Sequence, residues 1–189
     1  MKSKNSKQSD WIGIDFGTCY SSAARLNGSI PVMIPVRDAP DMGSTQRPTA
    51  AYITKDGRIK TGYAAEPYRF NDPDRFFERF KLDIIDDQPL LRDSHITYAD
   101  LVAAILSDIR EDAEKDNNAK PVNNAVITVP AIYMKDDPRW QIMEKSAYSA
   151  GFEKVELLHE PEAAALYYQN VSGETMNDLT LVYDLGGGT

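Results

Sequence analysis

Short apolar or alternating runs, bounded by turn-forming residues, occur along most of the chain and are typical of β-strands. They predict strands at residues 11–14, 20–26, 29–36, 49–54, 58–61, 125–129, 155–158 and 179–184. Asn27-Gly28, a dipeptide favoured in two-residue hairpin turns, separates the second run from the third. Pro31 and Pro35 each lack a backbone N–H, so they put the third strand at a sheet edge or bend it.

Apolar residues at helical spacing predict the helices that accompany these strands. The clearest helix follows Thr97-x-x-Asp100, which resembles a capping box, and carries Leu101 and Ile105 on its apolar face. Further helices are predicted at 62–66, 74–81, 139–150 and 162–168. The charged run 111–120 is interpreted as a solvated helix end and loop. Because the second half alternates strands with helices, we predict an α/β fold with a partly parallel sheet and crossover helices.

Composition narrows the class of protein. The chain has 189 residues, of which 42% are apolar and 26% charged, as in ordinary soluble globular proteins. Its net charge of −8 disfavours binding to nucleic acid or to anionic membranes, and no stretch is apolar enough to span a bilayer. Residues 1–10 form a polar stretch without an apolar signal core, which we interpret as a disordered tail. Cys19 is the single cysteine, which fits a reducing, cytoplasmic location.

Two stretches, WIGIDFGT at 11–18 and LVYDLGGGT at 181–189, share one pattern: an apolar run, an aspartate and a glycine turn. Glycine turns let backbone N–H groups approach an anion, and an aspartate beside phosphates holds a divalent cation through its waters. Either copy alone is more often a plain exit from a strand, whereas two copies favour a clamp on a nucleotide polyphosphate and its Mg²⁺. Neither copy matches a P-loop or a dinucleotide-binding glycine motif.

With these motifs placed, the chain resembles the ATPase domain of DnaK-type chaperones, the heat shock protein 70 family. The resemblance is carried, in matching order, by WIGIDFGTCYS at 11–21, NAVITVPAIY at 124–133, Gly151-Phe152, LLHEPEAAALYY at 157–168 and VYDLGGGT at 182–189. It implies an actin-like, ribonuclease-H-like ATPase lobe, in which helices flank a mixed sheet and ATP binds between two lobes. This chain would be the first lobe, without the second lobe or the peptide-binding domain.

The resemblance also implies a division of the chain. A core subdomain would comprise 11–37 and 115–189, and an inserted α+β subdomain would comprise 38–114. Because half of the clamp would lie in the second lobe, we expect the fragment by itself to bind ATP·Mg²⁺ weakly or not at all. The face left bare by that lobe would favour dimers.

Roles at the phosphate site follow from the same resemblance. Asp15 and Asp184 would orient Mg²⁺ through its waters, and Glu160 would position the attacking water. Gly17, Thr18 and Cys19 would lend backbone N–H groups to the phosphates, and Tyr20 would lie beside the phosphates. Half of the second phosphate loop would be Gly186, Gly187, Gly188 and Thr189. Family members usually carry threonine where Cys19 stands. The alternative for Glu160 is a cap on the helix that begins at Pro161.

Two further positions carry implied roles outside the phosphate site. Pro130 resembles the proline switch that links the nucleotide site to the substrate domain, and it ends a strand in either case. Arg139 is the candidate partner arginine, although it lies one residue further from Pro130 than in the family.

One departure concerns the catalytic lysine of the family. In this chain Glu66 follows Gly62-Tyr63-Ala64-Ala65, where the family has that lysine. A carboxylate there removes positive charge that the transferring phosphoryl group needs. Either Lys60, Arg69 or Lys81 substitutes, or the parent protein hydrolyses ATP slowly, which is our hypothesis.

The function implied is an ATP-dependent folding chaperone of the stress response. Its parent would convert ATP to ADP and phosphate with Mg²⁺ and bind unfolded client peptides, a J-domain cochaperone and a nucleotide exchange factor. An actin-like nucleotide switch or scaffold with little turnover is the second hypothesis, favoured by Glu66 and Cys19. A sugar or acetate kinase of the same superfamily is the third.

Overall fold

The computed structural model describes residues 10–85, 88–173, 180–184 and 186. Its strands are β1 (Trp11–Phe16), β2 (Tyr20–Asn27), β3 (Ile30–Met33), β4 (Gln46–Pro48), β5 (Ala50–Ile53), β6 (Ile59–Thr61), β7 (Phe76–Glu78), β8 (Asn124–Val129) and β9 (Lys154–His159). Its α-helices are α1 (Tyr68–Asn71), α2 (Tyr98–Asp116), α3 (Pro138–Ser149) and α4 (Glu160–Ser172). Short 3₁₀ turns, η1, η2 and η3, cover Gly62–Ala64, Pro73–Arg75 and Phe80–Asp83.

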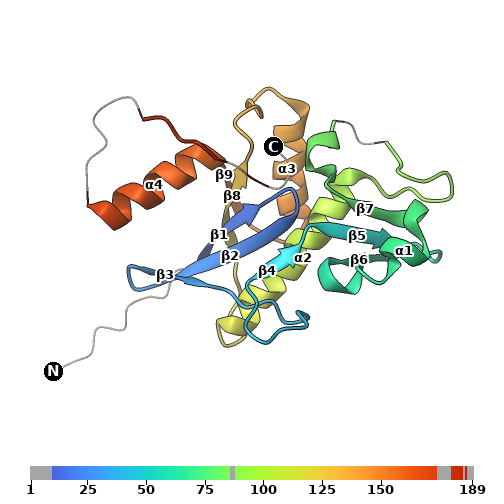
Figure 1. The fold of residues 1–189 in the computed structure, drawn as a ribbon, viewed down its shortest axis with the longest axis horizontal. Coiled ribbons are helices and arrows are strands. Elements are labelled where there is room, and N and C mark those ends of the chain that lie inside the picture. The colour runs from blue at the N-terminus through green and yellow to red at the C-terminus, as the bar shows by residue number, and fades with distance from the viewer. Residues whose placement is uncertain (1–9, 86–87, 174–179, 185, 187–189) are drawn as a thin grey trace.

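The strands form two sheets. The larger has the order β3-β2-β1-β8-β9, with β4 paired to β2. Strands β1, β2 and β3 are antiparallel, whereas β1, β8 and β9 are parallel, so the predicted mixed sheet with helices is confirmed. The smaller sheet has the order β6-β5-β7 and lies beyond α2, next to α1 (Figure 1). β3 is an edge strand, as expected. The hairpin turn comes one residue later than predicted, at Gly28-Ser29 with Gly28 at φ 66°, because Asn27 still pairs with Ile30.

The alternation along β1 explains how the two faces of the larger sheet differ. Ile12, Ile14 and Phe16 are buried, while Gly13 and Asp15 between them are exposed on the opposite face. Successive side chains of a strand point to opposite faces, so β1 faces the core on one side only.

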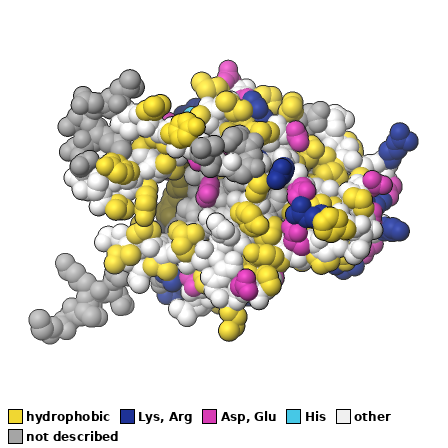
Figure 2. Space-filling model, viewed as in Figure 1, with side chains coloured by type: hydrophobic (Ala, Val, Ile, Leu, Met, Phe, Trp, Pro, Cys, Tyr) yellow, Lys and Arg dark blue, Asp and Glu magenta, His cyan; other side chains and the backbone are white. Residues whose placement is uncertain are grey.

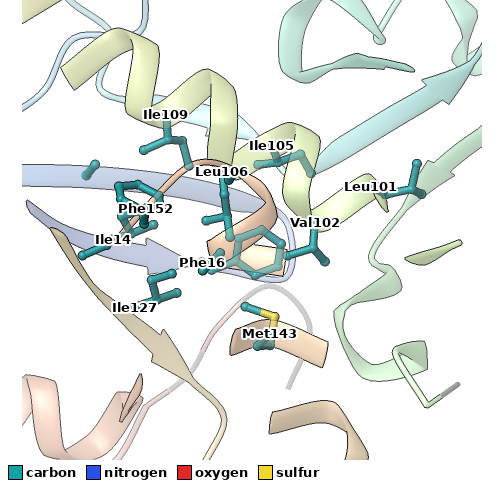
Figure 3. Packing of buried hydrophobic residues seen from close by; sticks show 14 of the residues in the cluster. Ile14, Phe16, Leu101, Val102, Ile105, Leu106, Ile109, Ile127, Met143 and Phe152 are labelled. Atoms are coloured by element: carbon teal, nitrogen blue, oxygen red, sulfur yellow. The ribbon is translucent and has the colours of Figure 1, made fainter. Parts of the chain in front are cut away.

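The core lies between the larger sheet and the helices α2 and α3. Seven buried residues of α2 belong to it, namely two alanines and five larger residues, and Figure 3 shows Val102 and Leu106 of this helix beside Phe16 of the sheet. These five are Leu101, Val102, Ile105, Leu106 and Ile109. The helix begins as predicted, because Thr97 accepts a hydrogen bond from the backbone N–H of Asp100 and the Asp100 side chain completes the capping box. Helix α3 ends before Gly151, whose φ of 94° suits a glycine after a helix end.

The opposite face of the larger sheet is only partly covered, by α4. Figure 2 shows a hollow between α4 and the β2–β3 hairpin, with hydrophobic side chains on its walls. Its volume is about 400 Å³, and its lining includes Met33, Val126, Leu158, Leu166 and Tyr167. The two faces of the sheet therefore differ in burial, one forming the core and the other an open groove.

Two predicted elements were wrong. Residues 74–81 form no α-helix: Phe76–Glu78 is β7, paired with β5 and flanked by the turns η2 and η3. Pairing with β5 places Phe77 against the core, which outweighs the helical spacing of the phenylalanines. Residues 180–184 form no strand, and residue 179 lies outside the described part of the chain. None of the described strands forms a ladder with residues 180–184.

The C-terminal end of α2 was predicted to be solvated. In the structure, arginine side chains pair with its carboxylates. Asp108, Asp112 and Asp116 lie four residues apart and so share one face of the helix. Arg47 Nη2 lies 2.7 Å from Asp112 Oδ2, and each of these two side chains is 3% exposed. Arg25 Nε lies 2.6 Å from Asp116 Oδ2. The sequence pattern did not reveal these pairs, because their arginines lie 65 and 91 positions away.

Arg47 is the centre of this charged cluster. It also contacts Asp38 at 3.0 Å and Asp108 at 3.5 Å, and its stem lies against Gly62. Gly62 has φ 54°, and a Cβ atom built there would lie 2.8 Å from the Cγ atom of Arg47. The cluster thus joins α2, the loop after β3 and the start of the 62–64 turn.

We predict that Asp112→Ala destabilises the fold by about 3 kcal/mol, because it leaves the buried Arg47 charge without its closest partner. The control is Glu111→Ala, which removes a neighbouring carboxylate that is 56% exposed and pairs with Arg37. That loss is expected to stay below about 1 kcal/mol. Urea unfolding followed by circular dichroism measures both. Equal, small losses in the two variants would contradict the assigned role of the buried pair.

Candidate functional site

A cavity of about 930 Å³ contains residues from both ends of the described chain. Asp15, in β1, and Asp184, close to the C-terminus, both line it. The other predicted site residues that line it are Gly17, Thr18, Cys19, Tyr20, Glu160 and Gly186. Gly187, Gly188 and Thr189 lie outside the described residues. Pro130 and Arg139, predicted as a switch rather than as ligands, are not among the lining residues.

The turn after β1 is held by local and long-range contacts. Asp15 lies on the open face of the sheet, where Thr128 of β8 donates a hydrogen bond of 2.9 Å to its Oδ1. A Cβ atom at Gly17 would collide with the carbonyl oxygen of Tyr20, so only glycine fits this turn. The backbone N–H of Thr49 donates to the Cys19 carbonyl at 2.8 Å. The turn is therefore fixed from two sides, and no side chain at position 17 narrows the approach to it.

Glu160, the first residue of α4, is held by an ion pair. Lys81 is 1% exposed, and its Nζ atom pairs with Glu160 and donates to the Phe16 carbonyl. Helix α4 has no side-chain cap at His159, so the capping alternative is not seen. Pro161 occupies the first turn as predicted. Lys81 thus links the end of β1 to the beginning of α4, on either side of the cavity.

The predicted substitutes for the family lysine each have another partner. Glu66 Oε1 lies 2.9 Å from Arg69 Nη2, and this pairing raises the pKa of Arg69. Arg69 also pairs with Glu78, and Lys60 donates to the hydroxyl of Tyr68 at 2.7 Å. None of Lys60, Arg69 and Lys81 is among the described lining residues of the large cavity.

Among the lining residues that were not predicted from the sequence, Arg79 is the charged one. It follows β7 directly and adopts φ 55°, ψ 19°. The stretch 74–81 was predicted to be helical, and a helix has no left-handed residue in its interior. Because residues 74–81 were assigned to a helix, the left-handed turn at Arg79 was not predicted.

The predicted switch residues contact a buried tyrosine. Tyr133 donates its backbone N–H to the Pro130 carbonyl at 2.9 Å, and the Arg139 guanidinium lies 4.7 Å from the centre of its ring. Its hydroxyl donates to the Lys81 carbonyl. Pro130 and Arg139 therefore meet at Tyr133, which in turn contacts the residue that pairs with Glu160.

The site suits a metal ion that keeps part of its water shell. Within the described ranges, no three His, Cys, Asp or Glu side chains are grouped closely enough to hold a metal. Mg²⁺ characteristically binds one or two carboxylates and completes its shell with water and substrate phosphates. Asp15 and Asp184 in one cavity fit that mode of binding.

Comparison with known proteins gives the family. The family model described as "Hsp70 protein" matches residues 90–189, more than half of the chain. The chain belongs to the Hsp70 family. Membership implies the actin-like ATPase lobe, which agrees with the mixed sheet and its helices. Among the described helices, none has the length and apolar character needed to cross a bilayer.

The curated relatives are proteins named "Chaperone protein DnaK". Those of Elusimicrobium minutum and Thermoplasma acidophilum are each 36% identical to this chain over 179 residues, which is 94% of the chain. That of Methanothermobacter thermautotrophicus is 32% identical over 97% of the chain. The chain spans only 28–30% of the length of these relatives.

We predict that alkaline pH destabilises the fold through Tyr133. Burial raises the pKa of its phenol to about 12, whereas an unfolded tyrosine titrates near 10. Because the neutral phenol is the folded form, its stabilising contribution is present below about pH 10 and is lost between about 10 and 12. Absorbance of phenolate during a pH titration should show a late-titrating tyrosine that Tyr133→Phe removes. Loss of an ordinary, early-titrating tyrosine in that variant would contradict the assignment.

Proposed function

We propose that this chain is a nucleotide-binding part of an ATP-dependent molecular chaperone, and that the large cavity receives the phosphates of ATP or ADP with Mg²⁺. The observation that carries the proposal is the presence of Asp15, the 17–19 turn, Glu160 and Asp184 around one cavity. Membership of the Hsp70 family supports the same conclusion.

Binding would rest on the two phosphate loops. Backbone N–H groups of Gly17, Thr18 and Cys19 would donate to phosphate oxygens, since consecutive amides form an anion-binding nest. The loop that begins near Gly186 would contribute from the other side. Asp15, oriented by its hydrogen bond from Thr128, and Asp184 would hold the waters around Mg²⁺. Bound Mg²⁺ would neutralise charge on the phosphates.

Hydrolysis would be an in-line attack of water on the terminal phosphate, giving ADP and phosphate. Glu160 would accept a hydrogen bond from that water and orient it. Its ion pair with Lys81 fixes the carboxylate at the edge of the cavity, because the buried ammonium has few alternative positions. Positioning of the nucleophile and electrostatic stabilisation of the transferring phosphoryl group are the protein's contributions in this class of reaction.

Signalling away from the site would use Pro130 and Arg139. Their contacts with Tyr133, and the hydrogen bond from Tyr133 to the Lys81 carbonyl, form a continuous path to Glu160. Residues 38–114 would be the inserted subdomain, with the β6-β5-β7 sheet as its centre. In the whole protein, unfolded client peptides, a J-domain cochaperone and a nucleotide exchange factor would be the partners, in the cytoplasm.

An actin-like nucleotide switch with little turnover is the second candidate. The pairing of Glu66 with Arg69 favours it, because this pair neutralises the position where the family places a lysine. A low rate of ATP hydrolysis by the full-length protein, with normal nucleotide binding, would distinguish it from an active chaperone.

We predict weak, phosphate-dependent binding of Mg²⁺·ATP by the 189-residue chain, with a dissociation constant on the order of 1 mM. Titration followed by amide NMR should shift the signals of Gly17 and Thr18. Asp15→Ala should reduce the effect of Mg²⁺ on binding, whereas Asp56→Ala, in the exposed β5–β6 turn, should leave it unchanged. Shifts confined to residues outside the cavity, or no shifts at saturating nucleotide, would reject the proposed site.

A further inference from the structure

We propose that Arg79 is the phosphate-binding cation of this cavity, an inference that rests on the nucleotide-binding function proposed above. The starting point is the charge of the lining. Asp15, Glu160 and Asp184 bring three carboxylates to the cavity, and a polyphosphate adds further negative charge. Among the described residues that line the cavity, Arg79 carries the one positive side chain. A guanidinium is suited to this role because its planar fork can donate two parallel hydrogen bonds to a phosphate.

Arg79 is available for such a ligand. Neighbouring cations are paired: Arg69 with Glu66 and Glu78, and Lys81 with Glu160. Arg79 is exposed, and no carboxylate of the described residues forms an ion pair with it. Its charge is therefore not already neutralised within the described chain.

The acids that share the neighbouring cavity with Arg79 pair with Arg69 and not with Arg79. A second cavity, of about 230 Å³, adjoins the first, and Arg79, Cys19 and Tyr20 line both. Glu66 and Glu78 line this smaller cavity and are both occupied by Arg69. Arg79 thus lines both cavities, with the phosphate turn in one and the carboxylates that pair with Arg69 in the other.

The backbone of Arg79 supports a role other than packing. Its φ of 55° and ψ of 19° lie in the left-handed region, which favours glycine over residues with a Cβ atom. The position is fixed on both sides, by the pairing of Glu78 with Ala50 and by the buried Phe80 and Lys81. Strained residues of this kind are common at ligand sites. A side chain is kept at a position where glycine would fit the backbone better.

This strain allows a test that separates ligand binding from folding. Arg79→Gly removes the guanidinium and relieves the backbone, so the melting temperature should stay the same or rise. Binding of Mg²⁺·tripolyphosphate and Mg²⁺·ATP, measured by amide NMR titration of the 189-residue chain, should weaken about tenfold or more. Arg79→Gln, which keeps the length of the side chain and removes its charge, should weaken binding to a similar degree. The matched control is Arg58→Ala, which removes an exposed arginine from the β5–β6 turn and should leave binding unchanged.

The outcomes separate this proposal from the function on which it rests. Unchanged binding by Arg79→Gln, while the wild-type chain binds, overturns the role of Arg79 and leaves the nucleotide site intact. An equal loss in Arg58→Ala overturns it too, because the effect would then be one of net charge. Absence of binding by the wild-type chain overturns the proposed site and this inference together.

Discussion

The buried ammonium of Lys81 is the constraint on which the candidate site depends. A charge that is 1% exposed is stable only if its desolvation is offset by partners, and Lys81 has the Glu160 carboxylate and the Phe16 carbonyl. Its own carbonyl accepts from the hydroxyl of Tyr133. The end of β1, the 80–83 turn, the loop after β8 and the start of α4 are thereby joined at one point. The cavity walls on either side of it are therefore fixed by the same contacts that stabilise the fold.

Adjacent residues of β1 serve the candidate site and the core. Ile14 and Phe16 are buried beneath α2 (Figure 3), while Asp15 between them is directed to the open face, where Thr128 donates to it. A shift of one residue in the pairing of β1 with β8 would bury the carboxylate and expose the core. Core packing therefore determines where the acidic group points.

Much of the fold and part of the site could be predicted from local patterns. The start of α2, the glycine after α3 and the acids that follow the apolar runs are all encoded within a few residues. Arg47 with Asp112 and Lys81 with Glu160 were not predictable, because each pair joins residues more than 60 positions apart. Phe76 and Phe77 were assigned to a helix because their spacing allows it, whereas pairing with β5 made them a strand. Arg79 directly follows that strand, so its place at the cavity was not predicted either.

The residue at position 62 is limited by the side chain of Arg47, which is itself held by acids far along the chain. A methyl group there would meet the stem of Arg47, and this arginine cannot move without leaving Asp38, Asp108 and Asp112. Relatives that acquire a larger residue at 62 are thus expected to have exchanged Arg47 as well, together with one or more of those acids. Evolutionary drift at these positions would be concerted rather than independent.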